Sequence, residues 1–169
     1  MSKNVEVIRK FPDAILKAKA KTIENIDGIV IETLDKMLKV VRLAEGAGLA
    51  ANQIGIGRRL AVAMVDEKRF IKLINPRIKE LDGEEVDEEG CLSIPGAVIK
   101  VPRATRIVVE YLNEDGDTKI LEAKGFAARV LQHEIDHLNG ILIIDKLNPE
   151  EKLKFLRKYR KIETSQGGL

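Results

Sequence analysis

The sequence predicts an α+β fold, because helical patterns lie towards both ends of the chain and strand patterns dominate its middle. A long N-terminal helix is expected over residues 25–45, where apolar side chains recur at the three- and four-residue intervals of one helix face. Asn25 is its expected N-cap, and Gly46 is expected to end it. After Pro149, residues 150–161 are predicted to form a short, charged C-terminal helix.

Strands are predicted where short apolar and partly β-branched stretches lie between turn residues. These stretches are residues 59–65, 70–75, 105–112 and 119–123. The pair Asp82-Gly83 is typical of a hairpin turn. A second helix is expected between Gly125 and Gly140, and a short apolar strand over residues 141–144.

Length and composition indicate a soluble globular protein. The 169 residues are most simply one domain, 1–169, and their apolar fraction of 44% is enough for a substantial core. The net charge of +2 argues against a nucleic-acid binder. Neither a signal peptide nor an apolar run of membrane-spanning length is present, and the single cysteine suits a reducing compartment. We therefore expect a cytoplasmic protein that contacts no membrane.

Both histidines of the chain, His133 and His137, stand four residues apart with Glu134 directly after the first. On a helix, such a pair lies on one face about 5–6 Å apart, so both imidazoles can reach one metal ion. Glu134 points to a different side, from which it can take a proton from an activated water. Two partly buried imidazoles with ordinary hydrogen bonds are the alternative, but the intervening glutamate favours a metal site.

A catalytic metal needs a third protein ligand and an open position. In metzincin-type zinc proteases that ligand is a histidine six residues after the second one, a position occupied here by Ile143, although Gly140 matches that pattern's glycine. Thermolysin-like proteases use a downstream glutamate, and the candidates lie in the charged tail: Glu150, Glu151 and Glu163. The strongest remaining candidate is Cys91, the only thiol.

Cys91 follows Glu89-Gly90, where glycine lets the backbone come close to a ligand. Burial as a small apolar side chain is the alternative. A thiolate cancels one positive charge of a divalent ion, and the remaining charge still acidifies water for attack on an amide. Glu134 would take the proton and deliver it to the leaving amine. One cysteine and two histidines accept zinc, ferrous iron, cobalt or nickel.

An acyl-transfer reaction also needs hydrogen-bond donors for the developing oxyanion. The side-chain amide of Gln53 and the backbone N–H of Leu92 are the candidates. The glycine-rich residues 46–57 could instead suggest a phosphate loop. A helix rather than a strand precedes them and no Gly-Lys-Ser/Thr is present, so we exclude phosphate binding.

Three segments together resemble the signature motifs of peptide deformylases: residues 46–53, 89–93 and 132–137. The similarity runs from about residue 7 to residue 147. It implies an enzyme that removes formate from the N-formylmethionine of new bacterial polypeptides. It also implies mixed or antiparallel sheets packed around a central helix that carries the histidines.

The resemblance further implies roles for individual residues. Cys91, His133 and His137 would be metal ligands, Glu134 the general acid/base, and Gln53 with the Leu92 backbone the oxyanion site. Ferrous iron is the usual native metal of such enzymes, and zinc, nickel or cobalt can replace it. The peptide would bind as an added strand along backbone at Ala47, Gly48 and Gly90.

The pocket for the methionine side chain is expected on the helix face of His133. Phe126, Arg129 and Val130 precede that histidine by seven, four and three residues and share its face. Arg129 is unusual in an apolar pocket, so its stem is predicted to form the wall while its charged head reaches water. Arg103 is interpreted either as a charge partner near the Cys91 thiolate or as part of a surface salt bridge.

Six basic residues mark the C-terminal helix: Lys152, Lys154, Arg157, Lys158, Arg160 and Lys161. A solvated helix is the simplest interpretation. In some deformylases the terminal helix binds the ribosome, and we keep this as a hypothesis. Two other functions stay open from the residues alone. One is a zinc endopeptidase with a downstream carboxylate ligand, and the other is a non-catalytic module with a closed, four-ligand metal site.

Overall fold

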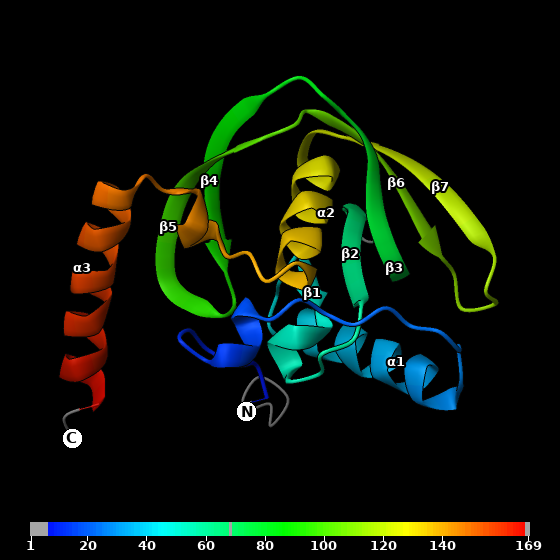
Figure 1. Ribbon diagram of the computed structural model, residues 1–169, viewed down its shortest axis with the longest axis horizontal. Coiled ribbons are helices and arrows are strands. Elements are labelled where there is room, and N and C mark those ends of the chain that lie inside the picture. The colour runs from blue at the N-terminus through cyan, green and yellow to red at the C-terminus, as the bar shows by residue number, and fades with distance from the viewer. Residues whose placement is uncertain (1–6, 68, 168–169) are drawn as a thin grey trace.

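The β structure consists of a five-stranded antiparallel sheet and a separate two-stranded hairpin (Figure 1). The computed structural model describes residues 7–67 and 69–167. The strand order of the large sheet is β1-β2-β3-β6-β7, and the hairpin pairs β4 with β5. The strands are β1 (Gly48–Ala50), β2 (Leu60–Asp66), β3 (Arg69–Asp82), β4 (Glu85–Cys91), β5 (Ile94–Arg103), β6 (Arg106–Leu112) and β7 (Thr118–Lys124).

Helix α2 occupies the centre, between the large sheet and the β4–β5 hairpin, while α1 and α3 lie at the periphery (Figure 1). The α-helices are α1 (Gly28–Leu43), α2 (Gly125–Leu138) and α3 (Pro149–Gly167). The short 3₁₀ helices are η1 (Ala14–Lys17), η2 (Ala51–Ile54) and η3 (Ile143–Lys146). The predicted arrangement of sheets around a central helix is therefore confirmed. The large sheet and the hairpin are antiparallel throughout.

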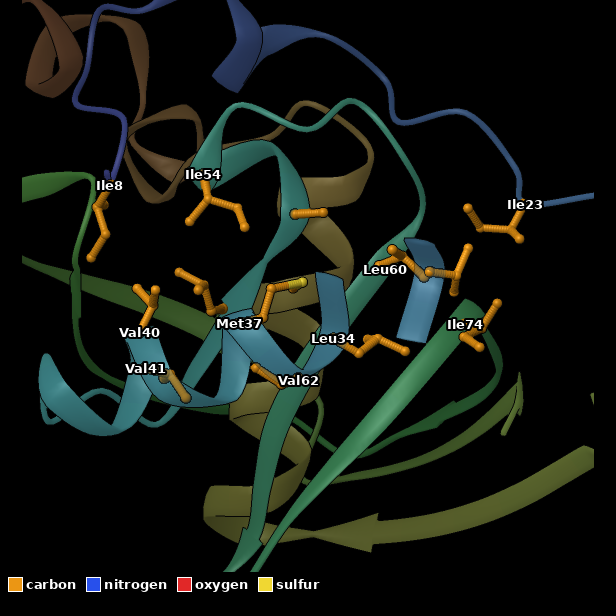
Figure 2. Close-up of a cluster of buried hydrophobic side chains, with 13 residues drawn as sticks. Ile8, Ile23, Leu34, Met37, Val40, Val41, Ile54, Leu60, Val62 and Ile74 are labelled. Carbon is orange, nitrogen blue, oxygen red and sulfur yellow. The ribbon is translucent and has the colours of Figure 1, made fainter. Parts of the chain in front are cut away.

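Helix α1 covers one face of the sheet with the apolar side chains that its periodicity predicts. Leu34 and Met37 are fully buried and, as Figure 2 shows, point from α1 into a cluster with side chains of β2 and β3. The helix begins later than predicted, because Asp27, not Asn25, accepts the hydrogen bond from the Val30 N–H at 3.0 Å. This cap fixes the first turn and leaves Asn25 in the preceding loop.

Strand β2 is buried on both faces, so its side chains alternate between two cores. Leu60 and Val62 pack in the α1 cluster, whereas Ala61 and Ala63 pack in the α2 cluster. The large residues thus face a peripheral helix, and the alanines face the helix that carries the histidines. Because alanine adds only one methyl group, α2 can lie close to the sheet.

The β4–β5 hairpin was not predicted, because its first strand is acidic and largely exposed. The Asp82-Gly83 prediction was also wrong. This turn joins β3 of the large sheet to β4 of the hairpin, and the two strands do not pair with each other. Residues 141–144 were wrongly predicted as a strand. Ile143 and Ile144 are buried as expected, but they begin the 3₁₀ helix η3. A short apolar run alone does not distinguish these states.

Helix α3 is longer than predicted, with 19 residues against 16 in α1. It packs on the outside of the hairpin through a third cluster, in which Tyr159 and Phe155 lie near Val101 and Phe11. Among the described residues, no helix combines the length and the apolar character needed to cross a membrane.

Candidate active site

The three predicted ligands meet at the floor of one cleft. His133 and His137 project from the same face of α2, and their Nε2 atoms are 3.1 Å apart. Cys91, the last residue of β4, brings its Sγ to 3.3 Å from Nε2 of His137. All three ligand atoms lie within 4.8 Å of one another. Two elements far apart in the sequence thus present one sulfur and two nitrogens to a common point.

This donor set fits a divalent transition metal ion. Zinc binds cysteine and histidine with ligands about 2.0–2.3 Å away in a tetrahedral arrangement, which places the ligand atoms about 3–4 Å from one another. The surroundings also favour a positive charge. Burial opposes protonation of His133, but hydrogen bonds to Cys91 and Glu89 and the nearby negative charges raise its pKa to about 10. A metal ion would supply the positive charge in place of that proton.

The pKa of the second imidazole shifts in the opposite direction. His137 is 1% exposed, and burial together with the charge of His133 lowers its pKa well below the ordinary value. A histidine must be neutral to bind a metal, so His137 is already in the required form.

Glu89 orients the first imidazole, a role that the sequence analysis missed. Its Oε1 lies 2.9 Å from Nδ1 of His133, on the side of the ring away from the ligand nitrogen. Burial opposes ionisation of Glu89, but hydrogen bonds from His133 and Arg103 outweigh it and lower the pKa of the carboxyl group far below its ordinary range. The carboxylate therefore stays negative and holds the ring with Nε2 towards the site. Its position within the 89–93 motif was the available signal.

Arg103 is buried, so the surface salt bridge considered from the sequence is wrong. Its guanidinium donates two parallel hydrogen bonds to the carboxylate of Glu89, from Nε to Oε2 and from Nη2 to Oε1, each 2.9 Å long. A third bond runs from Nη1 to Asp136 on α2. Arg103 thus acts on the site through the carboxylate that holds His133.

The prediction for Arg129 was half wrong. Arg129 lines the cleft as predicted. Its charged head does not reach water, because the side chain turns inward and only 9% of the residue is exposed. Nη1 donates to Oε2 of Glu89 at 2.7 Å and to the Val101 carbonyl at 2.8 Å, and Nη2 donates to the Glu85 carbonyl at 2.8 Å. Only the local helix face could be inferred from the sequence, not these partners.

Glu134 lies beside the ligands, and 4% of it is exposed. Among the described residues its Oε2 has no hydrogen-bond partner. Burial raises the pKa of this carboxyl group to about 7, although the charges of His133 and Arg103 oppose the shift. A group with such a pKa can both accept and donate a proton near neutral pH.

Gln53 has a fixed orientation. Its Oε1 accepts the Ala50 N–H at 2.9 Å, so its Nε2 points to the other side, 3.1 Å from the hydroxyl of Ser93 and 3.9 Å from Sγ of Cys91. The neighbouring Asn52 donates from its side chain to the His137 carbonyl. Helix η2 is thereby anchored to α2, with the Gln53 amide facing the ligands.

The cleft above the ligands has a volume of about 620 Å³. Apart from buried His137, every predicted site residue lines it: Ala47, Gly48, Gln53, Gly90, Cys91, Leu92, Phe126, Arg129, Val130, His133 and Glu134. Phe126 is 64% exposed and lies at the opening, whereas Val130 is buried. The first two turns of α2 therefore offer apolar surface leading from solvent towards the ligands.

Residues 5–153, which include the whole site, match the family model of polypeptide deformylase. The chain belongs to the polypeptide deformylase family. A peptide deformylase of Dictyoglomus thermophilum is 48% identical over 150 residues, which cover 89% of this chain and 97% of that one. The crystal structure of a peptide deformylase from Legionella pneumophila agrees with a TM-score of 0.87 at 39% identity, over 95% of this chain and 96% of that one.

A deformylase crystal structure with Met-Ala-Ser bound, from Acinetobacter baumannii, is also similar. Its TM-score is 0.78 at 30% identity, and the match covers 83% of this chain and 96% of that one.

As a peptide deformylase, this protein is a metal-dependent hydrolase that removes the N-formyl group from the N-terminal methionine of nascent polypeptides. The resemblance of the three motifs is thus confirmed, and the two alternatives, a zinc endopeptidase and a non-catalytic metal module, are excluded. The roles of the individual residues stay predictions.

Gly48 tests how tightly the deformylase site holds Glu134. A Cβ atom at this glycine would lie 2.7 Å from Oε1 and 2.8 Å from Cγ of Glu134, so the buried carboxylate would have to move. We expect Gly48→Ala to slow deformylation roughly 100-fold, because small misplacements of reacting groups cost about that much. The rate of amine release from formyl-Met-Ala-Ser is the measurement.

Gly57→Ala is the matched control, since a Cβ there meets no atom within 4 Å. A Gly48→Ala enzyme that is as fast as Gly57→Ala would show that the carboxylate is not held by this contact.

Proposed function

We propose that deformylation takes place in this cleft and that Cys91, His133 and His137 hold the single divalent ion on which the reaction depends. The convergence of their three ligand atoms within 4.8 Å is the observation that carries the proposal. When bound, such an ion polarises the formyl carbonyl and lowers the pKa of water. The Cys91 thiolate offsets one of its charges, so the ligand set suits a neutral amide substrate.

Glu134 is the proposed general acid/base. Its carboxylate takes a proton from the attacking water as the new C–O bond forms, and returns it to the nitrogen as the formyl C–N bond breaks. The products are formate and a peptide with a free amino group. The unpartnered Oε2 and the pKa of about 7 support this assignment, because both leave the group ready to exchange a proton.

Gln53 and the Leu92 backbone are the proposed donors to the oxygen that becomes negative. The Gln53 amide is oriented before substrate arrives, since its own oxygen is tied to the Ala50 N–H. Donors that need no reorientation stabilise a developing charge most effectively. Leu92 directly follows Cys91 at the end of β4 and lines the cleft, which supports its backbone N–H as the second donor.

The substrate is proposed to bind as an extra strand between β1 and β4. β1 is an edge strand of the large sheet, and β4 has only β5 as a partner among the described strands. Ala47, Gly48 and Gly90 line the cleft beside these edges. The methionine side chain would then point to Phe126 and Val130. The deformylase structure with Met-Ala-Ser bound supports a peptide with an N-terminal methionine as the ligand of this cleft, because that peptide corresponds to a deformylated product.

Arg129 contributes the aliphatic part of its side chain to the same proposed pocket. Because its guanidinium is committed to Glu89 and to two backbone carbonyls, it presents no charge to the methionine side chain. The substrate pocket is therefore proposed to remain apolar despite the arginine.

Glu134→Gln tests the acid/base assignment. Glutamine fills the same space but cannot accept the proton, so we expect the deformylation rate on formyl-Met-Ala-Ser to fall by about 10²–10⁴-fold while the metal content is retained. Amine release and elemental analysis of the same preparation are the measurements. The control is Glu32→Gln, an exposed residue of α1 outside the cleft, which should keep its rate. A Glu134→Gln enzyme as fast as this control contradicts the assignment.

We propose ferrous iron as the native metal, with zinc, nickel or cobalt able to replace it. Thiolate and imidazole ligands accept all four ions, so the donor set alone does not choose among them. After anaerobic purification we expect about one iron per chain. A chelator should abolish activity, and each of the four ions should restore it. An anaerobic preparation that contains one equivalent of zinc and no iron would contradict the proposed native metal.

We further propose that the enzyme works in the cytoplasm as one domain, residues 1–169, and that α3 contacts the ribosome. Lys154, Arg157 and Lys158 of α3 are exposed, whereas Tyr159 is buried in the cluster beside the hairpin. Helix α3 itself lies at the periphery of the molecule (Figure 1). The combined changes Lys154→Glu, Arg157→Glu and Lys158→Glu should abolish co-sedimentation with ribosomes at low salt, because phosphate contacts are electrostatic. Lys119→Glu, on exposed β7, is the control. Equal binding by both variants would refute ribosome docking through α3.

A further inference from the structure

The side chain of Arg129 projects from α2 and hydrogen-bonds to both strands of the β4–β5 hairpin. From α2 it reaches the Glu85 carbonyl of β4 at 2.8 Å, the Val101 carbonyl of β5 at 2.8 Å and the Glu89 carboxylate of β4 at 2.7 Å. Among the described residues, no other side chain of α2 bonds to both strands. One guanidinium thus connects the helix to the whole width of the hairpin.

The two elements that Arg129 joins are the two that carry the proposed ligands. His133 and His137 belong to α2, and Cys91 ends β4. Their spacing therefore depends on how the hairpin sits against the helix. Apolar contacts between these elements are few, since β4 is mostly exposed and the hairpin's own cluster lies on its α3 side. Hydrogen bonds therefore contribute much of what sets this spacing. They come from the two arginines and from Gln132 of α2, which bonds to the N–H and the carbonyl of Ala104 directly after β5, each at 2.9 Å.

A second arginine supports the junction from the opposite side. Arg103 belongs to β5, pairs with Glu89 and reaches Asp136 on α2, which is also 3.1 Å from the ammonium of Lys146. Of the two arginines, Arg129 is the one that donates to backbone carbonyls of the hairpin. The two residues therefore differ, because Arg103 fixes a carboxylate and Arg129 also fixes the strands themselves.

We infer that Arg129 is a positioning residue, which holds the hairpin, and with it Cys91, in register with the two histidines. The inference rests on the proposed ligand set. It gives the guanidinium of Arg129 a second role, support of the metal site, beside the pocket role proposed for the aliphatic stem. Its guanidinium acts through Glu89 and the hairpin backbone, and it touches neither substrate nor ligand atoms.

Arg129→Met tests this inference, because methionine keeps an apolar stem in the cleft and removes the three hydrogen bonds. With cobalt bound, the thiolate-to-cobalt absorption reports whether Cys91 is a ligand, and competition with a chelator gives the affinity. We expect the affinity to fall by roughly 10–100-fold, as is typical when support of a ligand is lost. We also expect the thiolate band to weaken, and kcat to fall more than KM changes.

Arg59→Met is the matched control for general loss of structure. Arg59 also binds backbone: its guanidinium donates to the Pro76 carbonyl at 3.2 and 3.0 Å, to the Leu138 carbonyl at 3.5 Å and to Oδ1 of Asn139 at 2.9 Å. Unlike Arg129, it has no hydrogen bond to the described residues of the hairpin. Its variant should keep the cobalt affinity and the thiolate band of the unmodified enzyme. Equal losses in both variants would overturn the inference.

Arg129→Lys decides the matter if the methionine variant does not fold. Lysine keeps a cation near Glu89 but cannot reach both carbonyls. The cobalt affinity of this variant should therefore lie between that of the unmodified enzyme and the roughly 10–100-fold lower affinity expected for the methionine variant. A folded lysine or methionine variant with unchanged affinity and thiolate band would overturn the inference while leaving the proposed function intact. An unmodified enzyme that shows no thiolate band would instead refute the ligand set, and both ideas with it.

Discussion

The buried negative charge of Glu89 is the constraint on which the rest of the site depends. A carboxylate that is 7% exposed is stable only if its charge is matched and its oxygens are hydrogen-bonded. Arg103, Arg129 and His133 meet these needs, and they come from β5 and α2. Satisfying one carboxylate therefore fixes a strand, a helix and the direction of an imidazole ring together. The energetic cost of leaving any of these groups unpaired keeps the three elements in register.

The close approach of α2 to the large sheet is the second condition for the site. Where β2 faces α2 it carries Ala61 and Ala63, and where it faces α1 it carries Leu60 and Val62. Gly48 continues this pattern beside Glu134, whose side chain occupies the place of a Cβ. Small residues on one face thus give the functional helix its position, and large ones on the other supply apolar burial.

Local patterns predicted the chemistry of the site better than its support. The histidine pair could be placed because two residues at helix spacing share a face whatever surrounds them. Cys91 followed by elimination, because the chain has one thiol. The hairpin that carries Cys91 could not be predicted, since β4 is acidic, mostly exposed and, among the described strands, paired with β5 alone. For Arg129 the helix face was right and the direction of the head was wrong, because its partners lie 28 to 44 residues away in the chain. Such distant partners are determined by tertiary packing, and the local spacing of apolar and polar residues in the sequence does not predict them.

The site contains two carboxylates close to the same imidazole, and their surroundings give them different properties. Glu89 accepts hydrogen bonds from Nδ1 of His133 and from Arg103, which lower its pKa far enough that it remains an anion. Glu134 is buried without such a partner, so its pKa rises to about 7. Glu89 can therefore hold the imidazole ring of His133 but does not take up a proton near neutral pH. Glu134 can exchange a proton near neutral pH but is poorly suited to orient a neighbouring side chain. A single type of side chain therefore provides both a fixed support and a movable proton. The difference is whether its oxygens are hydrogen-bonded to cationic groups or buried with an oxygen left unpartnered among the described residues.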